Sequence, residues 1–176
     1  EKILNAPAGS MVYIEPDIVL SHDNSARGRK IFEKSGGQAL VNPERLFIVL
    51  DRKMTGTTDE LIRDYNSIRD FMKEQEVEHF FDCDRGICHQ VVADYLRGGN
   101  IIVGSDSHTC TAGAFNCFAV GVNKTETAYL WKKGKMWFRV PETVKITLTG
   151  RLREGVYAKD LALWIMGMLR EENMDY

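Results

Sequence analysis

The sequence contains little cysteine and no C-x-x-C pair. Its four cysteines are Cys83, Cys88, Cys110 and Cys117. The separation of Cys83 from Cys88 is wider than the close spacing of a structural zinc site. No charged segment followed by an apolar signal run opens the chain, so reduced thiols are expected. We interpret the cysteines as buried or pocket-lining thiols, with a zinc site that includes the neighbouring His89 as the alternative.

Long apolar runs and a basic excess are also missing. No apolar stretch approaches the roughly 18 residues of a membrane span. The 23 Lys and Arg against 25 Asp and Glu give a net charge of −2, whereas nucleic-acid binders usually carry a strong basic excess. The hydrophobic (44%) and charged (27%) fractions exclude a disordered tail. We predict a cytoplasmic globular protein that binds neither membrane nor nucleic acid.

Short apolar segments alternate with helical patterns along the chain. Strands are expected at 11–19 (interrupted by Pro16), 46–50, 79–81, 101–103 and 144–149, and helices at 26–34, after 58, after 84, near 126–132 and at 157–170. Ser25, Thr58 and Asp84 are the expected helix caps. Strands and helices that alternate with short connections predict an α/β fold, a mostly parallel sheet wrapped by helices, in one domain over 1–176.

Three of the expected strands each run into an aspartate, namely Asp51, Asp82 and Asp106. Ligands of open parallel sheets bind beyond the carboxyl ends of the strands, so these carboxylates would converge if their strands are adjacent. The alternative is that aspartate merely begins turns and caps helices. That alternative is weakest for Asp106, because residues 106–109 (DSHT) place a carboxylate, two hydroxyls and an imidazole together.

Histidines accompany these strand ends. His108 lies two residues after Asp106, and His89 lies near the start of a helix that follows another strand. Two imidazoles and a carboxylate at neighbouring strand ends favour general acid–base work on a small polar substrate. A structural role for His89 is the alternative.

A second polar cluster, residues 21–25 (SHDNS), comes directly before a helix. One interpretation is an elaborate N-cap. The other is a site for a substrate carboxylate, since free N–H groups and the helix dipole favour an anion at a helix N-terminus.

Residues 104–111 (GSDSHTCT) and 86–92 (GICHQVV) resemble motifs of the aconitase superfamily. Residues 15–24, 134–143 and 155–160 are similar to large subunits of 3-isopropylmalate dehydratases and prokaryotic homoaconitases. The resemblance covers nearly the whole chain, in order. It implies an aconitase-like α/β fold and the N-terminal part of a longer large subunit.

The resemblance implies a hydro-lyase that isomerises a 2- or 3-hydroxy polycarboxylic acid, such as isopropylmalate or homocitrate, through an enoic intermediate. In the family the Lewis acid is the open iron of a [4Fe–4S] cluster held by three cysteines. Those cysteines lie beyond the stretch that matches here, so the cluster ligands are expected outside this chain. A small subunit with a swivelling domain, which carries the catalytic base, is the implied partner.

Residue roles follow from the same resemblance. The implied catalytic residues are Asp51, His89, Asp106 and His108, and the implied substrate contacts are His22, Arg52, Ser107 and Thr109. The family normally has a histidine where Arg52 follows Asp51, and arginine cannot cycle a proton near neutral pH. Arg52 would therefore clamp a substrate carboxylate, or the activity or the substrate is altered.

The alternative hypothesis is that the protein is not catalytic. Arg52 and the missing cluster cysteines favour a binding or regulatory protein on an aconitase-like scaffold without a cluster. The intact motifs around His89 and Asp106 favour catalysis. RNA binding has a precedent in the family, but the sequence offers no basic face for it.

Overall fold

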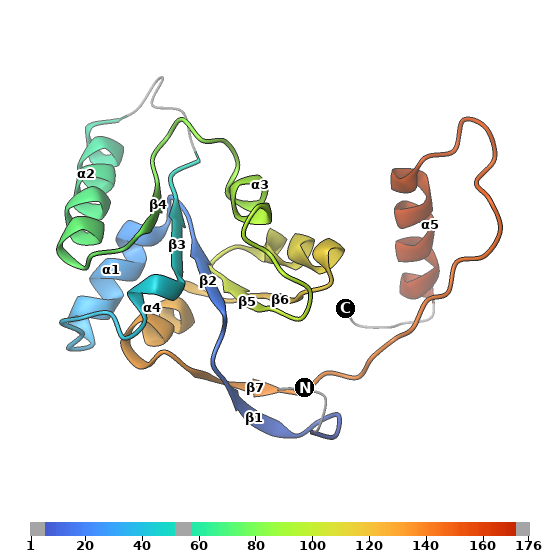
Figure 1. The fold of residues 1–176 in the computed structure, drawn as a ribbon, viewed down its shortest axis with the longest axis horizontal. Helices are drawn as coiled ribbons and strands as arrows, with labels where there is room; N and C mark the ends of the chain where they lie inside the picture. The colour runs from blue at the N-terminus through green and yellow to red at the C-terminus, as the bar shows by residue number, and fades with distance from the viewer. Residues whose placement is uncertain (1–5, 52–57, 172–176) are drawn as a thin grey trace. The chain divides into compact units, whose positions relative to one another are not determined.

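A computed structural model describes residues 6–51 and 58–171. It forms two compact units, Glu1–Pro141 and Glu142–Tyr176, each considered by itself below. Every strand and helix of the sheet layers belongs to the first unit (Figure 1), and the single α/β domain over 1–176 stays a prediction. Arg52, one of the predicted substrate contacts, lies outside the described residues.

The first unit is built on a five-stranded parallel sheet, which confirms the predicted fold class. Its strands are β2 (Ile18–Ser21), β3 (Leu46–Val49), β4 (His79–Phe81), β5 (Ile101–Gly104) and β6 (Phe118–Gly121), in the order β4-β3-β2-β5-β6. The chain first builds outward from β2 through β3 to β4. It then returns to place β5 on the other side of β2. The topological switch point, where such sheets bind ligands, is therefore between β2 and β5.

Helices cover both faces of this sheet. One face packs against α1 (Ser25–Lys34), α2 (Asp59–Glu74) and α4 (Lys124–Lys133), and the other against α3 (Cys88–Ala93) and the 3-10 helix η2 (Ser107–Phe115) (Figure 1). A short 3-10 turn, η1 (Pro43–Arg45), leads into β3. Successive side chains of a strand face opposite ways. Ile48 accordingly enters the first core and Phe47 the second, which explains why these strands are apolar at nearly every position.

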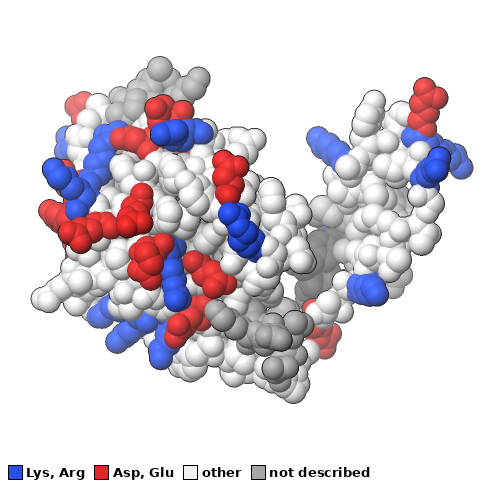
Figure 2. Space-filling model, in the orientation of Figure 1, with Lys and Arg blue, Asp and Glu red and all other residues white. Residues whose placement is uncertain are grey.

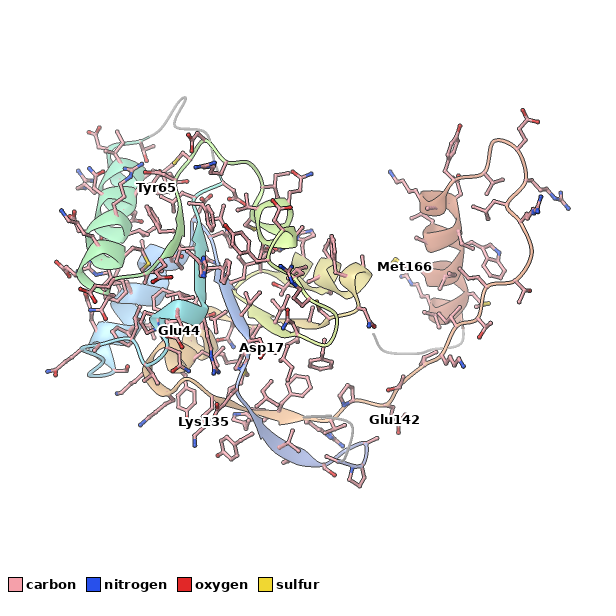
Figure 3. The ribbon with its side chains drawn as sticks, in the orientation of Figure 1. Asp17, Glu44, Tyr65, Lys135, Glu142 and Met166 are labelled. Carbon is pink, nitrogen blue, oxygen red and sulfur yellow. The ribbon has the colours of Figure 1, made fainter. Side chains whose placement is uncertain are left out.

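Helix α2 forms as its local sequence predicts. Thr58 Oγ1 accepts a hydrogen bond from the Leu61 N–H at 3.3 Å, and acidic residues occupy the first turn. Its buried stripe consists of Tyr65, Ile68, Phe71 and Met72. Tyr65, labelled in Figure 3, donates its hydroxyl hydrogen to Asp23 Oδ1 at 2.8 Å. The helix is thereby tied to the loop between β2 and α1.

Two predicted helix caps are wrong. Asn24, not Ser25, is the N-cap residue of α1, and its side chain makes no capping hydrogen bond. Asp84 does not cap α3, because a turn at Gly86 (φ +102°) separates it from the helix, which begins at Cys88 after Ile87. In both cases a tertiary contact or a turn decides where the helix begins.

A two-stranded antiparallel ribbon of β1 (Met11–Ile14) and β7 (Met136–Arg139) extends the first unit. The single extended segment predicted over 11–19 is divided at Pro16 into β1 and β2, because proline cannot donate to a strand ladder. Val12 and Phe138, which face each other across the ribbon, pack against the first core. Their neighbours Tyr13 and Trp137 are exposed.

The second unit contains α5 (Ala158–Glu171), as the apolar spacing predicts. The strand predicted at 144–149 is wrong: the segment forms no ladder, and Val144 and Leu148 are both 58% exposed. Its described neighbours in this unit include no strand that would complete its backbone hydrogen bonds. Among the described residues, no helix has both the length and the apolar character needed to cross a bilayer.

Charges of both signs are interspersed on the surface of the first unit. Figure 2 shows lysine and arginine next to aspartate and glutamate over the region of α1 and α2. Specific pairs join Arg29 to Glu33 and Lys30 to Asp64. On this face, positive and negative side chains are therefore closely mixed and do not form separate charged patches.

Candidate active site

An open cavity of about 390 Å³ lies at the carboxyl edge of the sheet. It is lined by His22, Asp51, Ile87, Cys88, His89, Asp106, His108 and Thr111. His22 follows β2, Asp51 follows β3 and Asp106 follows β5. Because β2 pairs with both β3 and β5 in parallel, three strands that are distant in sequence deliver these side chains to one edge.

The carboxylate of Asp106 is the centre of this site. Its Oδ2 atom lies 2.8 Å from His89 Nε2 and 3.0 Å from His108 Nδ1, and it accepts the His108 backbone N–H at 2.9 Å. The two imidazoles differ in burial: the His89 side chain is 14% exposed and that of His108 is 77% exposed. One carboxylate therefore orients two imidazoles in different environments.

Asp106 is held in its ionised form. Partial burial opposes its charge, but hydrogen bonds from His89 and from the backbone and ring of His108 outweigh burial and keep its pKa below the usual range. An ionised carboxylate accepts hydrogen bonds only, so the ring nitrogens that face it carry their protons. His108 then keeps Nε2, and His89 keeps Nδ1, for other partners.

A second histidine–carboxylate pair lies across the cavity. His22 Nδ1 is 4.0 Å from Asp51 Oδ1, and both side chains are largely buried. Asp51 Oδ2 also accepts the backbone N–H of Cys88 at 3.2 Å, which ties the end of β3 to the start of α3. Asp51 therefore fixes the start of the helix that carries His89, and it lies beside His22 at a distance longer than a hydrogen bond.

The predicted convergence of three aspartates holds for Asp51 and Asp106 but is wrong for Asp82. Asp82 follows the edge strand β4 and pairs with Arg69 of α2, through Nε at 2.7 Å and Nη2 at 2.8 Å. The Arg69 guanidinium, through these hydrogen bonds, holds the pKa of Asp82 well below its usual range. A basic partner on a covering helix thus removes this carboxylate from the cavity.

This pair predicts a pH-dependent stability. The folded-state pKa of Asp82 is depressed, so its contribution is present above the unfolded-state pKa of about 4 and declines as pH falls toward the folded value. Both side chains are about one-third or more exposed, so we expect Asp82→Asn to cost only about 0.5–1 kcal/mol at pH 7. Urea unfolding of both proteins between pH 7 and pH 2.5 should show this difference shrinking below pH 4. The control is Asp70→Asn, at an exposed position next to Arg69 on α2, and it should show no such trend. A difference for Asp82→Asn that stays constant with pH would contradict the assignment.

The amino-acid sequence matches a known family over nearly its whole length. The model of the aconitase family (aconitate hydratase) matches residues 1–175. The chain belongs to the aconitase family. It is 37% identical to the 3-isopropylmalate dehydratase large subunit 1 of Methanopyrus kandleri, which it matches over 100% of its own length and 44% of the relative's.

Other relatives show the same partial coverage. The chain is 35% identical to the 3-isopropylmalate dehydratase large subunit 1 of Thermotoga maritima, over 96% of this chain and 40% of that protein. It is also 35% identical to the protein named "Probable methanogen homoaconitase large subunit" of Methanothermobacter thermautotrophicus, over 100% of this chain and 44% of that protein. The aconitase-family chain thus spans less than half the length of these relatives.

Not every predicted site residue of this aconitase-family chain lines the cavity. His22, Asp51, His89, Asp106 and His108 do. Ser107 is exposed at the start of η2, next to the site. Thr109 is 1% exposed, and its hydroxyl donates to the Asp106 carbonyl at 2.6 Å. The structure therefore places Thr109 behind the site, where it holds the Asp106 backbone.

Two cavity residues were not predicted from the sequence, Ile87 and Thr111, whereas Cys88 lines the cavity as a buried thiol, as predicted. Ile87 and Cys88 directly precede His89, and Thr111 lies one turn after His108. Their proximity to predicted residues was the available signal. Ile87 stands out because it is 54% exposed in a cavity whose other lining is mostly polar.

The cysteines do not form a cluster-binding set. Cys88 is buried, Cys110 is exposed, and Cys83 and Cys117 are half-buried. Among the described residues, the groups of three or more close metal-ligating side chains contain no cysteine, which also speaks against the alternative zinc site at Cys83, Cys88 and His89. Burial raises the pKa of Cys83 to about 11 and raises that of Cys88 as well, so neither is a ready thiolate ligand. These thiols do not fit a [4Fe–4S] cluster.

Two sets of other donors have their ligand atoms within 4.8 Å of one another: His89, Asp106 and His108, and His22, Asp23 and Asp51. In the first set, Asp106 Oδ2 already serves both imidazoles. Two imidazoles that are hydrogen-bonded to one carboxylate are suited to acid–base chemistry.

Proposed function

We propose that this chain supplies acid–base groups for a hydro-lyase that removes and returns water on a 2- or 3-hydroxy polycarboxylic acid, through an enoic intermediate. The observation that carries the proposal is the Asp106 carboxylate, which holds His89 and His108 together beside an open cavity. Relatives named 3-isopropylmalate dehydratase and homoaconitase large subunits support the substrate class, with isopropylmalate and homocitrate as the leading substrates.

The reaction requires two proton transfers. Dehydration breaks a C–H bond at one carbon, and its proton passes to a base. The neighbouring C–O bond breaks with its electron pair on oxygen, which leaves as water once it is protonated. Return of water in the opposite sense gives the isomeric hydroxy acid. A site for this chemistry needs an acid next to the departing hydroxyl and a base next to the C–H bond.

His108 and His89 have complementary positions for this work. Asp106 binds Nδ1 of His108, which leaves Nε2 to exchange a proton with a substrate in the cavity. The more buried His89 is fixed through Nε2. We assign to His89 the protonation of the departing hydroxyl or the holding of the water it forms. Asp106 stabilises either imidazole when it is protonated.

Substrate carboxylates need donors around this centre. His22, which lies beside Asp51, lines the same cavity, and Ser107 presents an exposed hydroxyl next to it. We assign both to substrate binding, with Arg52 as a further cationic partner that precedes the described helix α2 in sequence. Thr109 is not assigned to the substrate because its hydroxyl is buried against the Asp106 carbonyl.

The family's [4Fe–4S] cluster would supply a Lewis acid for the leaving hydroxyl. Because the four cysteines of this chain do not fit such a cluster, we derive no step from it and assign its ligands to residues outside this chain. The relatives' names, "large subunit", support a small-subunit partner. The misfit of the thiols also supports a second candidate function, a binding protein on the same scaffold that works without a cluster.

One experiment separates these two functions. The full-length protein, purified without oxygen together with its small subunit, is offered isopropylmalate and homocitrate, and the conjugated enoic acid is followed by its ultraviolet absorbance. The proposal expects formation of the enoic acid from at least one substrate, with about four irons per large subunit. Binding of these acids by calorimetry without turnover, in protein that holds no iron, would establish the binding function instead.

A further inference from the structure

The geometry points to Asn24 and Ser105 as positioning residues that fix the Asp106 carboxylate from outside the cavity. Asn24 begins α1, and Ser105 directly precedes Asp106. We call the pair, with Ser21, the Asn24–Ser105 clamp. The clamp lies at the switch point between β2 and β5. The segments that follow these two strands lead to helices on opposite faces of the sheet. The inference rests on the proposed function for its kinetic test only.

The two side chains form a reciprocal pair. Asn24 Nδ2 donates to the Ser105 carbonyl oxygen at 2.9 Å, and Ser105 Oγ donates to Asn24 Oδ1 at 2.8 Å. The amide thus binds both the backbone and the side chain of the residue before Asp106. Both bonds span 81 positions of sequence and join the loop after β2 to the end of β5.

A buried serine chain supports this pair. Ser25 Oγ donates to the His22 carbonyl oxygen at 2.5 Å and lies 2.8 Å from Ser21 Oγ. The Ser105 hydroxyl donates to Asn24 Oδ1, and Ser21 Oγ lies within hydrogen-bond distance of both members of the pair, 2.9 Å from Ser105 Oγ and 3.3 Å from Asn24 Oδ1. Ser21 and Ser25 are each 1% exposed. Buried hydroxyls with satisfied partners hold their geometry more strictly than exposed ones.

Asn24 forgoes a local hydrogen bond to make this contact. It occupies the N-cap position of α1, where asparagine usually accepts from a backbone N–H of the first turn, yet it makes no capping bond. Its backbone is helical (φ −77°, ψ −1°) rather than extended, and the amide serves Ser105 instead. Within the polar cluster at 21–25, Ser21, Asn24 and Ser25 therefore form the β2 side of the clamp, and Asn24 makes no N-cap hydrogen bond.

The clamp completes the restraint of the Asp106 backbone. On the upstream side, the Ser105 N–H donates to the Leu20 carbonyl and the clamp holds the Ser105 carbonyl. On the downstream side, Thr109 donates its N–H and its hydroxyl to the Asp106 carbonyl. A Cβ on Gly121 would lie 2.6 Å from that same carbonyl oxygen, so the packing there is close. With the backbone fixed on both sides, Oδ2 stays within reach of His89 and His108.

The kinetic test uses the full-length protein with its small subunit. Asn24→Ala and Ser105→Ala should each lower kcat about 10- to 100-fold with KM changed less than about threefold, because a small misplacement of catalytic groups is costly while substrate contacts remain. The double variant should lose no more than either single variant, since both remove one coupled unit. Unchanged kcat in Asn24→Ala, or losses that multiply in the double variant, would overturn the inference.

Asn123→Ala is the matched control. Asn123 caps α4 through a capping box with Glu126, so its loss lowers stability without touching the site. We expect the control to lower the unfolding midpoint while kcat stays unchanged. If kcat fell as much in Asn123→Ala as in Asn24→Ala, the loss in Asn24→Ala would be explained by lower stability alone. That result would overturn the inference.

A second readout needs no turnover. Selective isotopic labelling of the imidazoles in the same full-length protein resolves His89 and His108 by NMR, once each ring is assigned from the signal that disappears when that histidine is replaced. Asn24→Ala should shift the ring-nitrogen resonances of both and leave His79 unchanged, and Asn123→Ala should shift neither. Inactive wild-type protein would overturn the proposed function, while these resonances still decide the clamp: no shift in Asn24→Ala overturns it.

Discussion

Replacement of Asp106 by asparagine is expected to lower kcat by about 10³-fold in the full-length protein with its partner. The amide can still accept at the position of Oδ2, so the contacts with His89 and His108 need not be lost sterically. What disappears is the negative charge that fixes the tautomers and stabilises each imidazole when protonated. Steady-state kinetics on isopropylmalate and homocitrate would measure the loss.

The same variant should change the pH dependence in a defined direction. The pKa of Asp106 is held below its usual range, so wild-type activity that needs this carboxylate should decline only at acidic pH, and the residual activity of Asp106→Asn should lack that acid limb. Asp84→Asn is the control, since Asp84 is an exposed aspartate after the neighbouring edge strand β4, and it should keep wild-type kinetics. Near-normal kcat in Asp106→Asn, with the fold intact, would remove Asp106 from the acid–base machinery.

Replacement of Phe32 by alanine is expected to lower the free energy of unfolding by about 3–5 kcal/mol. Phe32 of α1 is 0% exposed and makes edge contacts with Phe71 of α2 at 5.8 Å and Trp131 of α4 at 6.3 Å between ring centroids. The backbone of Gly37 closes over its ring so tightly that a Cβ there would lie 2.5 Å from Cε2. Three helices thus meet on one side chain, and its truncation leaves a cavity that none of them can fill without moving.

Phe115→Ala provides the comparison for this loss. Phe115 is 46% exposed in η2, so the same chemical change should cost less than about 1 kcal/mol. Urea unfolding, followed by circular dichroism and tryptophan fluorescence, would measure both variants against wild type. Equal losses would mean that the contact of α1, α2 and α4 around Phe32 does not dominate this face of the core.

Local sequence was sufficient for elements whose own residues decide them. The apolar run at 46–50 predicted β3, and Thr58 with its acidic first turn and apolar stripe predicted α2. Elements that depend on distant partners were missed or misread. Strand β7 exists because it pairs with β1 across most of the chain, and residues 144–149 have strand-like alternation without a partner strand in their unit. Backbone hydrogen bonds between two strands cannot be predicted from the sequence of either strand alone.

The site shows the same division. Motifs around His89 and Asp106 identified both residues from the sequence, because several chemically capable side chains stand together in each motif. His22 and Asp51 line the same cavity because the strand order β4-β3-β2-β5 places β2 and β3 side by side. Asp82 does not line it, since Arg69 of α2 binds this carboxylate. The place of Thr109 behind the site follows from its hydrogen bond to the Asp106 carbonyl, a direction that sequence spacing does not fix.

By itself, then, the sequence determined the α/β class and the family, and its motifs predicted that His89, Asp106 and His108 belong to one site, because short-range patterns of apolar and chemically reactive side chains carry that information. Only the tertiary structure decided which carboxylates share the cavity and what Asn24 does. An asparagine before a helix predicts a cap, and here its amide binds Ser105, which directly follows β5 and lies 81 positions along the sequence. The choice between a local and a distant hydrogen bond depends on which partner the packed sheet brings within reach.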